Sequence, residues 1–253
     1  MRRLLAAAAI AAASLLTLGP ATAAPPGKDG AFNFRVGGFF PTGNSDFWDE
    51  KKNNFTLDRG DFNDGIGGVG YTASINNFFE FDVNADVYSS TVRSSDRDFV
   101  DDNGDLILHD TRLSMLPITV GFRVLPAGRY ARRGRDGRRY VRRPVPYFGA
   151  GVGMTYWEYE EKGDFVFLDP ATPSGVSISF DRLKDTGLEF EKHLKVGIEF
   201  PIAPEWNVTL EVRRSWAEAK LGDTFPSTAL STNDPRELDL GGASVYLGAS
   251  LRF

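Results

Sequence analysis

The chain has 253 residues, no cysteine, and 34 acidic against 29 basic residues. Its net charge of −5 does not favour a nucleic-acid partner, and the lack of cysteine excludes disulfide bonds as a source of stability. The 20 phenylalanines and 27 glycines fit an all-β chain better than a helical one.

The N-terminus has the pattern of a secretory signal peptide. Two arginines at positions 2 and 3 precede an apolar run from Leu4 to Leu18, and small residues after Pro20 form a cleavage-type site. We expect residues 1–23 to be the signal peptide and residues 24–253 to form one exported domain. No later stretch approaches the ~18 apolar residues that a membrane helix needs.

Alternation of apolar and polar residues dominates the mature chain. At the C-terminal end, Ala243, Val245 and Leu247 share one face of a strand, while Ser244 and Tyr246 share the other. The same period predicts eight strands of about ten residues or more, an even number that could close into a ring. Their ranges are 32–40, 65–74, 79–88, 112–124, 145–156, 188–200, 206–216 and 240–253.

The connections between these strands mostly alternate in length. Short turns are expected at 75–77 and 203–205, and long polar loops at 41–64, 89–111, 160–186 and 222–238. Short apolar arms at 165–168 and 176–180 are interpreted as extensions of the fifth and sixth strands. Pro117 predicts a bulge or a missing ladder bond within the fourth strand.

Alternation alone does not decide which face is buried. A soluble lipocalin-like barrel would turn its apolar face inward, whereas a membrane barrel turns it toward lipid. The polar faces carry many charges beside alternating glycines at 149, 151 and 153, and aromatic residues such as Trp206 and Trp216 end the apolar faces. Strands of this length also suit a tilted bilayer crossing, so the pattern favours a closed transmembrane barrel.

The signal peptide, the strand beginning at Val145 and the closing strand ending in Leu251-Arg252-Phe253 together resemble the eight-stranded outer-membrane β-barrels of the OmpA, OmpX and OmpW type. The resemblance implies an all-β, closed, antiparallel up-and-down barrel in a Gram-negative-type outer membrane, with periplasmic termini and extracellular long loops. It also implies contact with outer-membrane lipids and lipopolysaccharide. Phe253 would then be an assembly signal for the barrel-assembly machinery. We expect a monomer.

The inward face of such a barrel would carry a network of charges. An eight-stranded barrel is just wide enough for side chains to fill it, and buried charges need partners. The network could be a set of salt bridges that fills the lumen and fixes the barrel, or it could line a narrow conduit or a small-ligand cavity. Its expected members are Arg35, Glu80, Asp82, Asp86, Arg123, Glu189, Glu191, His193, Lys195, Glu199, Glu211, Arg213 and Arg252.

Catalytic and metal motifs are weak. Some barrels of this kind are lipid A deacylases with a histidine and a serine two positions apart, but Thr111 follows His109 and Lys195 follows His193 at that spacing. The acidic stretch 101–105 does not match a calcium loop, because Phe99 stands where the first aspartate belongs. We expect no catalytic residue, no cofactor and no metal.

The connection 125–144 departs from the short periplasmic turns of the family and is strongly basic. A polybasic segment beside a membrane can bind anionic headgroups, and a periplasmic partner is the other candidate. A solvated loop without a partner remains open as well. The arginines of this basic loop are Arg129, Arg132, Arg133, Arg135, Arg138, Arg139, Arg142 and Arg143.

The sequence therefore predicts a non-enzymatic outer-membrane barrel with a structural or surface-interaction role and a charge-filled lumen. A narrow porin-like channel for small solutes is the alternative, and a lipid A-modifying hydrolase is a more distant one.

Overall fold

The structure is a computed structural model that describes residues 30–101, 103–130, 144–168, 170–171, 175–203, 205–222 and 237–253. The expected signal peptide and seven of the eight arginines of the basic loop lie outside these residues.

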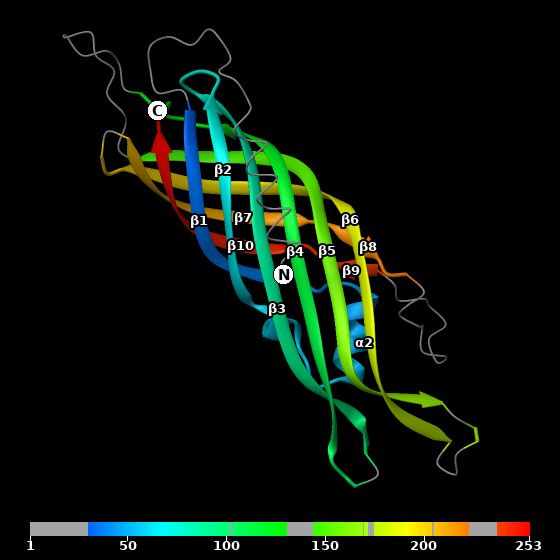
Figure 1. The fold of residues 1–253 in the computed structure, drawn as a ribbon. Helices are drawn as coiled ribbons and strands as arrows, with labels where there is room; N and C mark the ends of the chain where they lie inside the picture. The colour runs from blue at the N-terminus through cyan, green and yellow to red at the C-terminus, as the bar shows by residue number, and fades with distance from the viewer. Residues whose placement is uncertain are drawn as a thin grey trace, which may run out of the picture.

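Eight antiparallel strands form a closed barrel in which chain neighbours pair, and the last strand pairs with both β7 and β1 (Figure 1). This is the predicted up-and-down meander. Phe253 continues the closing ladder, since its backbone N–H donates to the Gly30 carbonyl at 3.0 Å. The strands are β1 (Gly30–Pro41), β2 (Asp64–Ser74), β3 (Phe79–Val100), β4 (Leu106–Val124), β5 (Val145–Leu168), β6 (Val176–Pro201), β7 (Trp206–Trp216) and β10 (Gly242–Arg252).

The apolar face of every barrel strand points outward, as predicted for a membrane barrel. Val36, Leu194 and Leu247 are each more than half exposed, whereas their strand neighbours Arg35, Lys195 and Tyr246 are buried. Aromatic residues such as Trp206 and Trp216 stand at the two ends of this outer face. We call the end that carries the short turns, Gly30 and Phe253 the turn end, and the opposite end the loop end. Within the described residues, no helix is both long and apolar enough to cross a bilayer.

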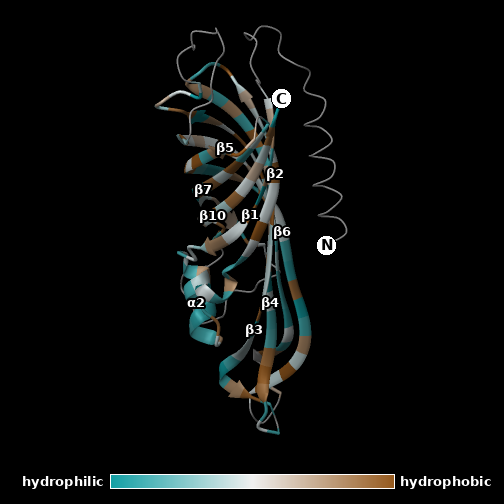
Figure 2. Ribbon diagram, turned by 90° about the vertical axis from the view of Figure 1, so that its left-hand side faces the viewer, coloured by the Kyte–Doolittle hydropathy of each residue, from teal (hydrophilic) through white to brown (hydrophobic). Residues whose placement is uncertain are grey.

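Four strands run far beyond the barrel at the loop end (Figures 1 and 2). Strands β3 and β6 have 22 and 26 residues, whereas β2 and β7 each have 11. The prediction of long loops at 89–111 and 160–186 is therefore mostly wrong, because most of these residues belong to the paired strands β3–β4 and β5–β6. We call residues 89–100, 106–115, 157–168 and 176–191 the overhang. At about 3.3 Å per residue, it rises more than about 30 Å past the barrel wall.

The long β1–β2 connection is also not the polar loop that was predicted. It contains helix α2 (Asp46–Asn54) and a 3₁₀ helix, η1 (Arg59–Phe62), and it lies against the inner side of the overhang (Figure 2). Its aromatic residues Phe47, Trp48 and Phe62 are buried. A small hairpin of β8 (Glu218–Lys220) and β9 (Glu237–Asp239) lies beside it. At Pro117 the ladder with β3 is interrupted without a register shift, because no pair forms between Ala85–Ile118 and Tyr88–Met115. This gap agrees with the missing ladder bond predicted at Pro117. A register shift occurs only between Ser95 and Val100.

Candidate functional site: a charge-filled lumen under an aromatic plug

Twelve of the thirteen charged and histidine residues expected in the lumen are buried inside the barrel; the exception is Glu189, which is half-buried. They come from six strands, because the period-two alternation turns every second residue inward. The buried members are Arg35, Glu80, Asp82, Asp86, Arg123, Glu191, His193, Lys195, Glu199, Glu211, Arg213 and Arg252.

In the middle of the lumen, two arginines share one aspartate. Arg35 donates to Asp86 through Nε at 2.7 Å, and Arg213 donates to the same carboxylate at 3.1 Å. Arg213 also donates to Glu211 at 3.2 Å, and the ring of Tyr246 lies under both guanidinium groups. These contacts tie β1, β3, β7 and β10 together across the barrel, so the network fixes the cross-section of the lumen.

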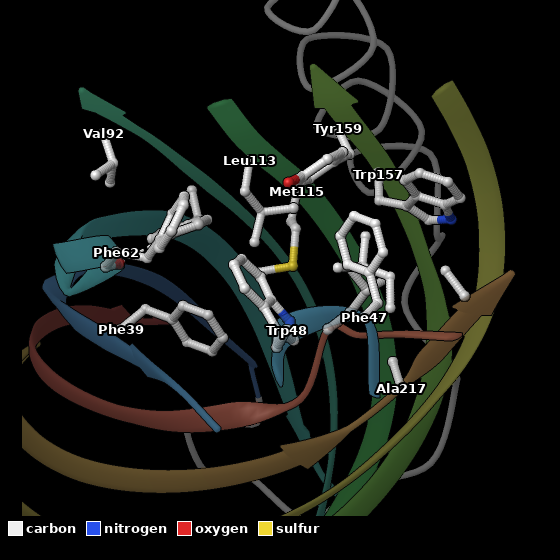
Figure 3. Close-up of a cluster of buried hydrophobic side chains, with 14 of the residues drawn as sticks. Phe39, Phe47, Trp48, Phe62, Val92, Leu113, Met115, Trp157, Tyr159 and Ala217 are labelled. Carbon is white, nitrogen blue, oxygen red and sulfur yellow. Dashed lines mark hydrogen bonds between the residues drawn. The ribbon is translucent and has the colours of Figure 1, made fainter. Parts of the chain in front are cut away.

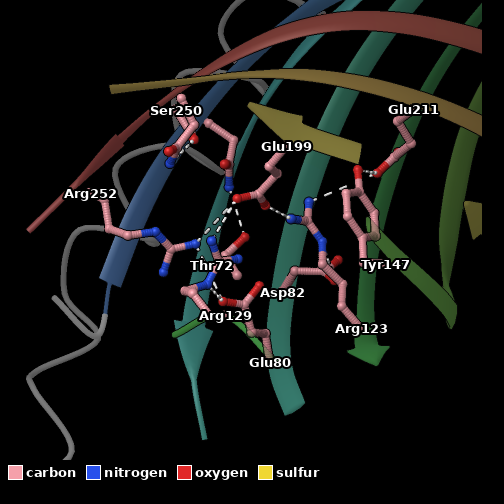
Figure 4. A network of polar contacts seen from close by, with 12 residues as sticks. Thr72, Glu80, Asp82, Arg123, Arg129, Tyr147, Glu199, Glu211, Ser250 and Arg252 are labelled. Carbon is pink, nitrogen blue, oxygen red and sulfur yellow. Dashed lines mark hydrogen bonds and ion pairs between the residues drawn. The ribbon is translucent and has the colours of Figure 1, made fainter. Parts of the chain in front are cut away.

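At the turn end, a second cluster contains a residue that the sequence placed elsewhere (Figure 4). Arg129 was assigned to the basic loop, but it is 1% exposed and lies in the mouth of the barrel. Its guanidinium donates to Glu80 at 2.7 Å and to Glu199 at 2.8 Å, and Arg252 approaches the same two carboxylates at 3.3 and 3.7 Å. The prediction for Arg129 is therefore wrong, because two buried carboxylates hold it in the lumen.

Arg123 connects the two clusters. Its guanidinium lies 3.1 Å from Glu199, 3.4 Å from Asp82 and 3.8 Å from Glu211, and it stacks on the ring of Tyr147. Lys195 donates to both oxygens of Asp82 at 2.6 and 2.7 Å. Because each charge in these two clusters contacts an opposite one, the clusters satisfy the condition under which ionised groups tolerate burial. Glu191 differs: within the described residues it accepts a hydrogen bond from Thr155 and has no arginine or lysine partner.

The glycine row of β5 makes room for bulky neighbours in this lumen. A Cβ on Gly151 would lie 2.6 Å from the His193 ring, and a Cβ on Gly149 would lie 3.0 Å from the Lys195 side chain. The backbone of β4 is closer still to both positions. The alternating glycines therefore let β5 pass close to two large residues of β6, as their pattern in the sequence indicated.

The loop-end half of the barrel is closed by an aromatic cluster that sequence reasoning missed (Figure 3). Trp48 of α2 is 1% exposed, packs edge-on against Phe62 at 5.0 Å between ring centroids, and donates its indole N–H to the Asp239 carbonyl at 3.1 Å. Phe47 packs edge-on against Tyr159 of the overhang at 5.3 Å. We call residues 42–63, which carry these rings, the plug. The adjacent aromatics Phe47 and Trp48 in a polar stretch were the available sequence signal.

Between the plug and the charge network lies a cavity of about 20 Å³, lined by Tyr88, Met115, Glu191, Arg213 and Tyr246, among others. A volume of this size holds about one water molecule. In the described part of the chain, ion-paired side chains thus occupy the lumen toward the turn end, and aromatic side chains occupy it toward the loop end.

His109 links the plug to the overhang at a point beyond the barrel wall. Its ring lies between Phe55 and Phe165, with centroids 4.5 and 4.8 Å away, and neither ring nitrogen has a hydrogen-bond partner in the described residues. Burial lowers the pKa of His109 below its ordinary value of 6.5, and the carboxylates of Glu161 and Asp96 oppose that shift. The docked plug therefore favours neutral histidine.

We expect the plug to loosen in acid. Because the pKa of His109 is lower when the plug is docked, the stabilisation is complete above pH 6.5 and is lost as the pH falls below that value. Hydrogen exchange of residues 42–63 should be faster at pH 5 than at pH 7.5 after correction for intrinsic rates. His109→Phe should remove most of this pH dependence; an unchanged pH profile in that variant would assign the effect to other groups.

The comparison with known families agrees with this architecture. Residues 7–253 match the family described as outer membrane protein beta-barrel domain. The chain belongs to this family, and it is an outer-membrane protein. Among curated proteins, no match was found.

Solved outer-membrane barrels are similar to the chain at low sequence identity. Neisserial surface protein A is 10% identical, with a TM-score of 0.43, over 90% of this chain and 98% of that one. OprG from Pseudomonas aeruginosa is 11% identical, with a TM-score of 0.46, over 89% and 96%. Outer membrane protein W from E. coli is 16% identical, with a TM-score of 0.36, over 89% and 98%.

Proposed function

We propose that this protein is a non-conducting outer-membrane barrel that acts through the sheet it raises beyond the membrane. The observation that carries the proposal is the filled lumen, with paired charges such as Glu199 and Arg129 in one half and the rings around Trp48 in the other. A solute would have to break buried ion pairs and displace packed aromatic rings to pass. Both steps are costly, so transport is not the function that this interior favours.

The overhang supplies the surface for an interaction role. Its β3 edge is joined by the plug, since Thr56 N–H donates to the Ser95 carbonyl at 2.9 Å. Its β6 edge is different: within the described residues, 177–184 form strand pairs only with β5. Asp185 accepts a hydrogen bond from the Gly222 N–H at 2.6 Å, and pairing with β7 begins at Lys192. An unpaired edge of this length can accept an added strand from another protein. With the loop end facing outward, as the resemblance implies, the edge would stand outside the cell.

Planar-bilayer recording tests the closed lumen. We expect the purified wild-type protein to give no reproducible conductance steps, because ion pairs and rings fill the barrel from end to end. Heat-modifiable migration of the same sample would show that it is folded. Discrete steps from folded protein would overturn the closed barrel and favour the narrow solute channel instead.

Photo-crosslinking on intact cells tests the interaction surface. A crosslinking residue at Ser179, on the free edge of β6, should give adducts with external protein, whereas one at Thr91, on the outer face of β3 near the barrel, should not. Equal yields at both positions, or no adducts at Ser179, would contradict a role for the edge.

A further inference from the structure

The outer wall of the barrel carries two charges where apolar side chains are expected. Of the outward positions in the described barrel strands, below the overhang, only Lys192 of β6 and Arg214 of β7 are charged. Their neighbours along the same outward face are Leu194, Val212 and Trp216, which belong to the lipid-facing surface. Charged residues on the lipid face of a barrel are unfavourable to a degree that depends on depth, so this pair needs an explanation.

The register places the two cations together. Lys192 pairs with Trp216, and Leu194 pairs with Arg214, so Lys192 and Arg214 are diagonal neighbours on adjacent strands. Diagonal neighbours have Cβ atoms about 7–8 Å apart, which long side chains easily span. The Arg214 guanidinium lies 5.6 Å from the centre of the Trp216 ring, and this cation–π contact restricts the position of the Arg214 side chain.

Neither cation has an acidic partner in the described residues, unlike two cations of the overhang on β6. There, Arg182 pairs with Glu160 at 2.8 Å and Lys184 pairs with Glu158 at the same distance. Arg182 and Lys184 are thus neutralised within the sheet, while Lys192 and Arg214 leave two positive charges for an external anion.

The position of Lys192 and Arg214 relative to the membrane interface indicates which anion they can reach. Trp216 ends β7 at the loop end, where an interfacial aromatic belongs, and Arg214 lies two residues before it. At about 3.3 Å per residue, the pair lies within about 7 Å of the aromatic level, where long side chains reach the headgroups. With the loop end outward, which the family resemblance implies, these are the headgroups of the outer leaflet.

We propose that Lys192 and Arg214 form a binding site for a phosphate group of an outer-leaflet glycolipid. The guanidinium supplies a planar donor fork and the ammonium a second charge, and both hydrogen-bond well to phosphate oxygens. The acyl chains of the same lipid lie along the apolar wall formed by Leu194 and Val212. The site requires the outer-membrane location and a loop end that faces outward, and it does not depend on the proposed interaction role of the overhang.

Lipid retention tests the site on the wild-type protein first. The barrel is reconstituted in phosphatidylcholine nanodiscs that contain lipid A with its phosphates, lipid A without them, or phosphatidylglycerol, and bound lipid is counted by native mass spectrometry. We expect phosphorylated lipid A to be retained about tenfold more than the dephosphorylated form, the effect of losing about 1.4 kcal/mol of charge-assisted contact. Equal retention of the two forms, or stronger retention of phosphatidylglycerol, would overturn the assignment.

Matched variants then locate the site. Lys192→Gln combined with Arg214→Gln should abolish the preference for phosphorylated lipid A while heat-modifiable migration persists. Arg182→Gln combined with Lys184→Gln removes the same charge from the overhang and should change retention less than about twofold, because those cations already have carboxylate partners. An equal loss in both double variants, or none in the first, would refute the proposed residues.

Discussion

Glu199→Gln should destabilise the barrel by about 3–5 kcal/mol, the typical cost of removing one partner from a buried charge pair. Glu199 lies within 3.7 Å of three guanidinium groups, those of Arg123, Arg129 and Arg252. Its neutralisation would leave three cations at the turn end with fewer carboxylates to balance them. Urea unfolding in lipid vesicles, followed by tryptophan fluorescence, measures the loss.

Glu189→Gln is the matched control for this variant. It is the same substitution on the inward face of the same strand, but Glu189 is half-buried and has no ion pair in the described residues. We expect a change below about 0.5 kcal/mol, as for a substitution away from buried networks. If the two variants unfold at the same urea concentration, the network does not stabilise the barrel as the structure implies.

Arg129→Gln in the Glu199→Gln background tests whether the two residues act together. Because their side chains are in direct contact at 2.8 Å, the double variant should cost less than the sum of the single ones. Additive costs would mean that Arg129 is held in the lumen by Glu80 alone.

Trp48→Ala should undock the plug while leaving the barrel closed. The indole is buried among Phe62, Tyr159 and neighbouring rings, and its N–H bonds the Asp239 carbonyl. Removing a buried tryptophan typically costs about 3–5 kcal/mol of stability. A helix of nine residues is at best marginally stable without tertiary contacts, so helix formation cannot offset this loss. Hydrogen exchange and limited proteolysis of residues 42–63 should both accelerate strongly.

The exposed Asn53 on the same helix provides the control, since Asn53→Ala removes no buried contact. That variant should retain wild-type protection of the plug. The barrel strands should stay protected in both variants, because their ladder closes between β1 and β10 without the plug. A Trp48→Ala protein with wild-type proteolysis would show that other contacts hold the plug.

Two features that the sequence did not predict, the overhang and the plug, share a physical cause. Beyond the membrane the outer face of a strand meets water, so outward residues such as Thr91 and Arg93 are polar and the alternation that marks a lipid-facing strand disappears. Helix α2 has only nine residues, too few to show a helical period clearly. The plug and most of the overhang were therefore interpreted as loops; only the arms 165–168 and 176–180 were correctly predicted as strand extensions.

The position of Arg129 is a third feature that the sequence could not predict. In the sequence it is the first of eight arginines in one connection, and nothing distinguishes it from the others. Its position became clear only when the barrel placed Glu80 and Glu199, 119 residues apart in the chain, beside one mouth. The assembly role of Phe253 stays a prediction; its ring packs on Phe32 at 5.3 Å, and half of its surface is exposed.

The sequence by itself determined the two faces of each barrel strand, because a period of two residues follows directly from the order of side chains. The charges on one face and the aromatic residues at the ends of the other then assigned the polar face to the lumen and the apolar face to lipid. It also determined the number of barrel strands and their order. Only the tertiary structure decided which charges pair, how far four strands continue past the barrel and what closes its loop end. These depend on contacts between residues far apart in the chain, such as Trp48 with Asp239, which no local pattern encodes.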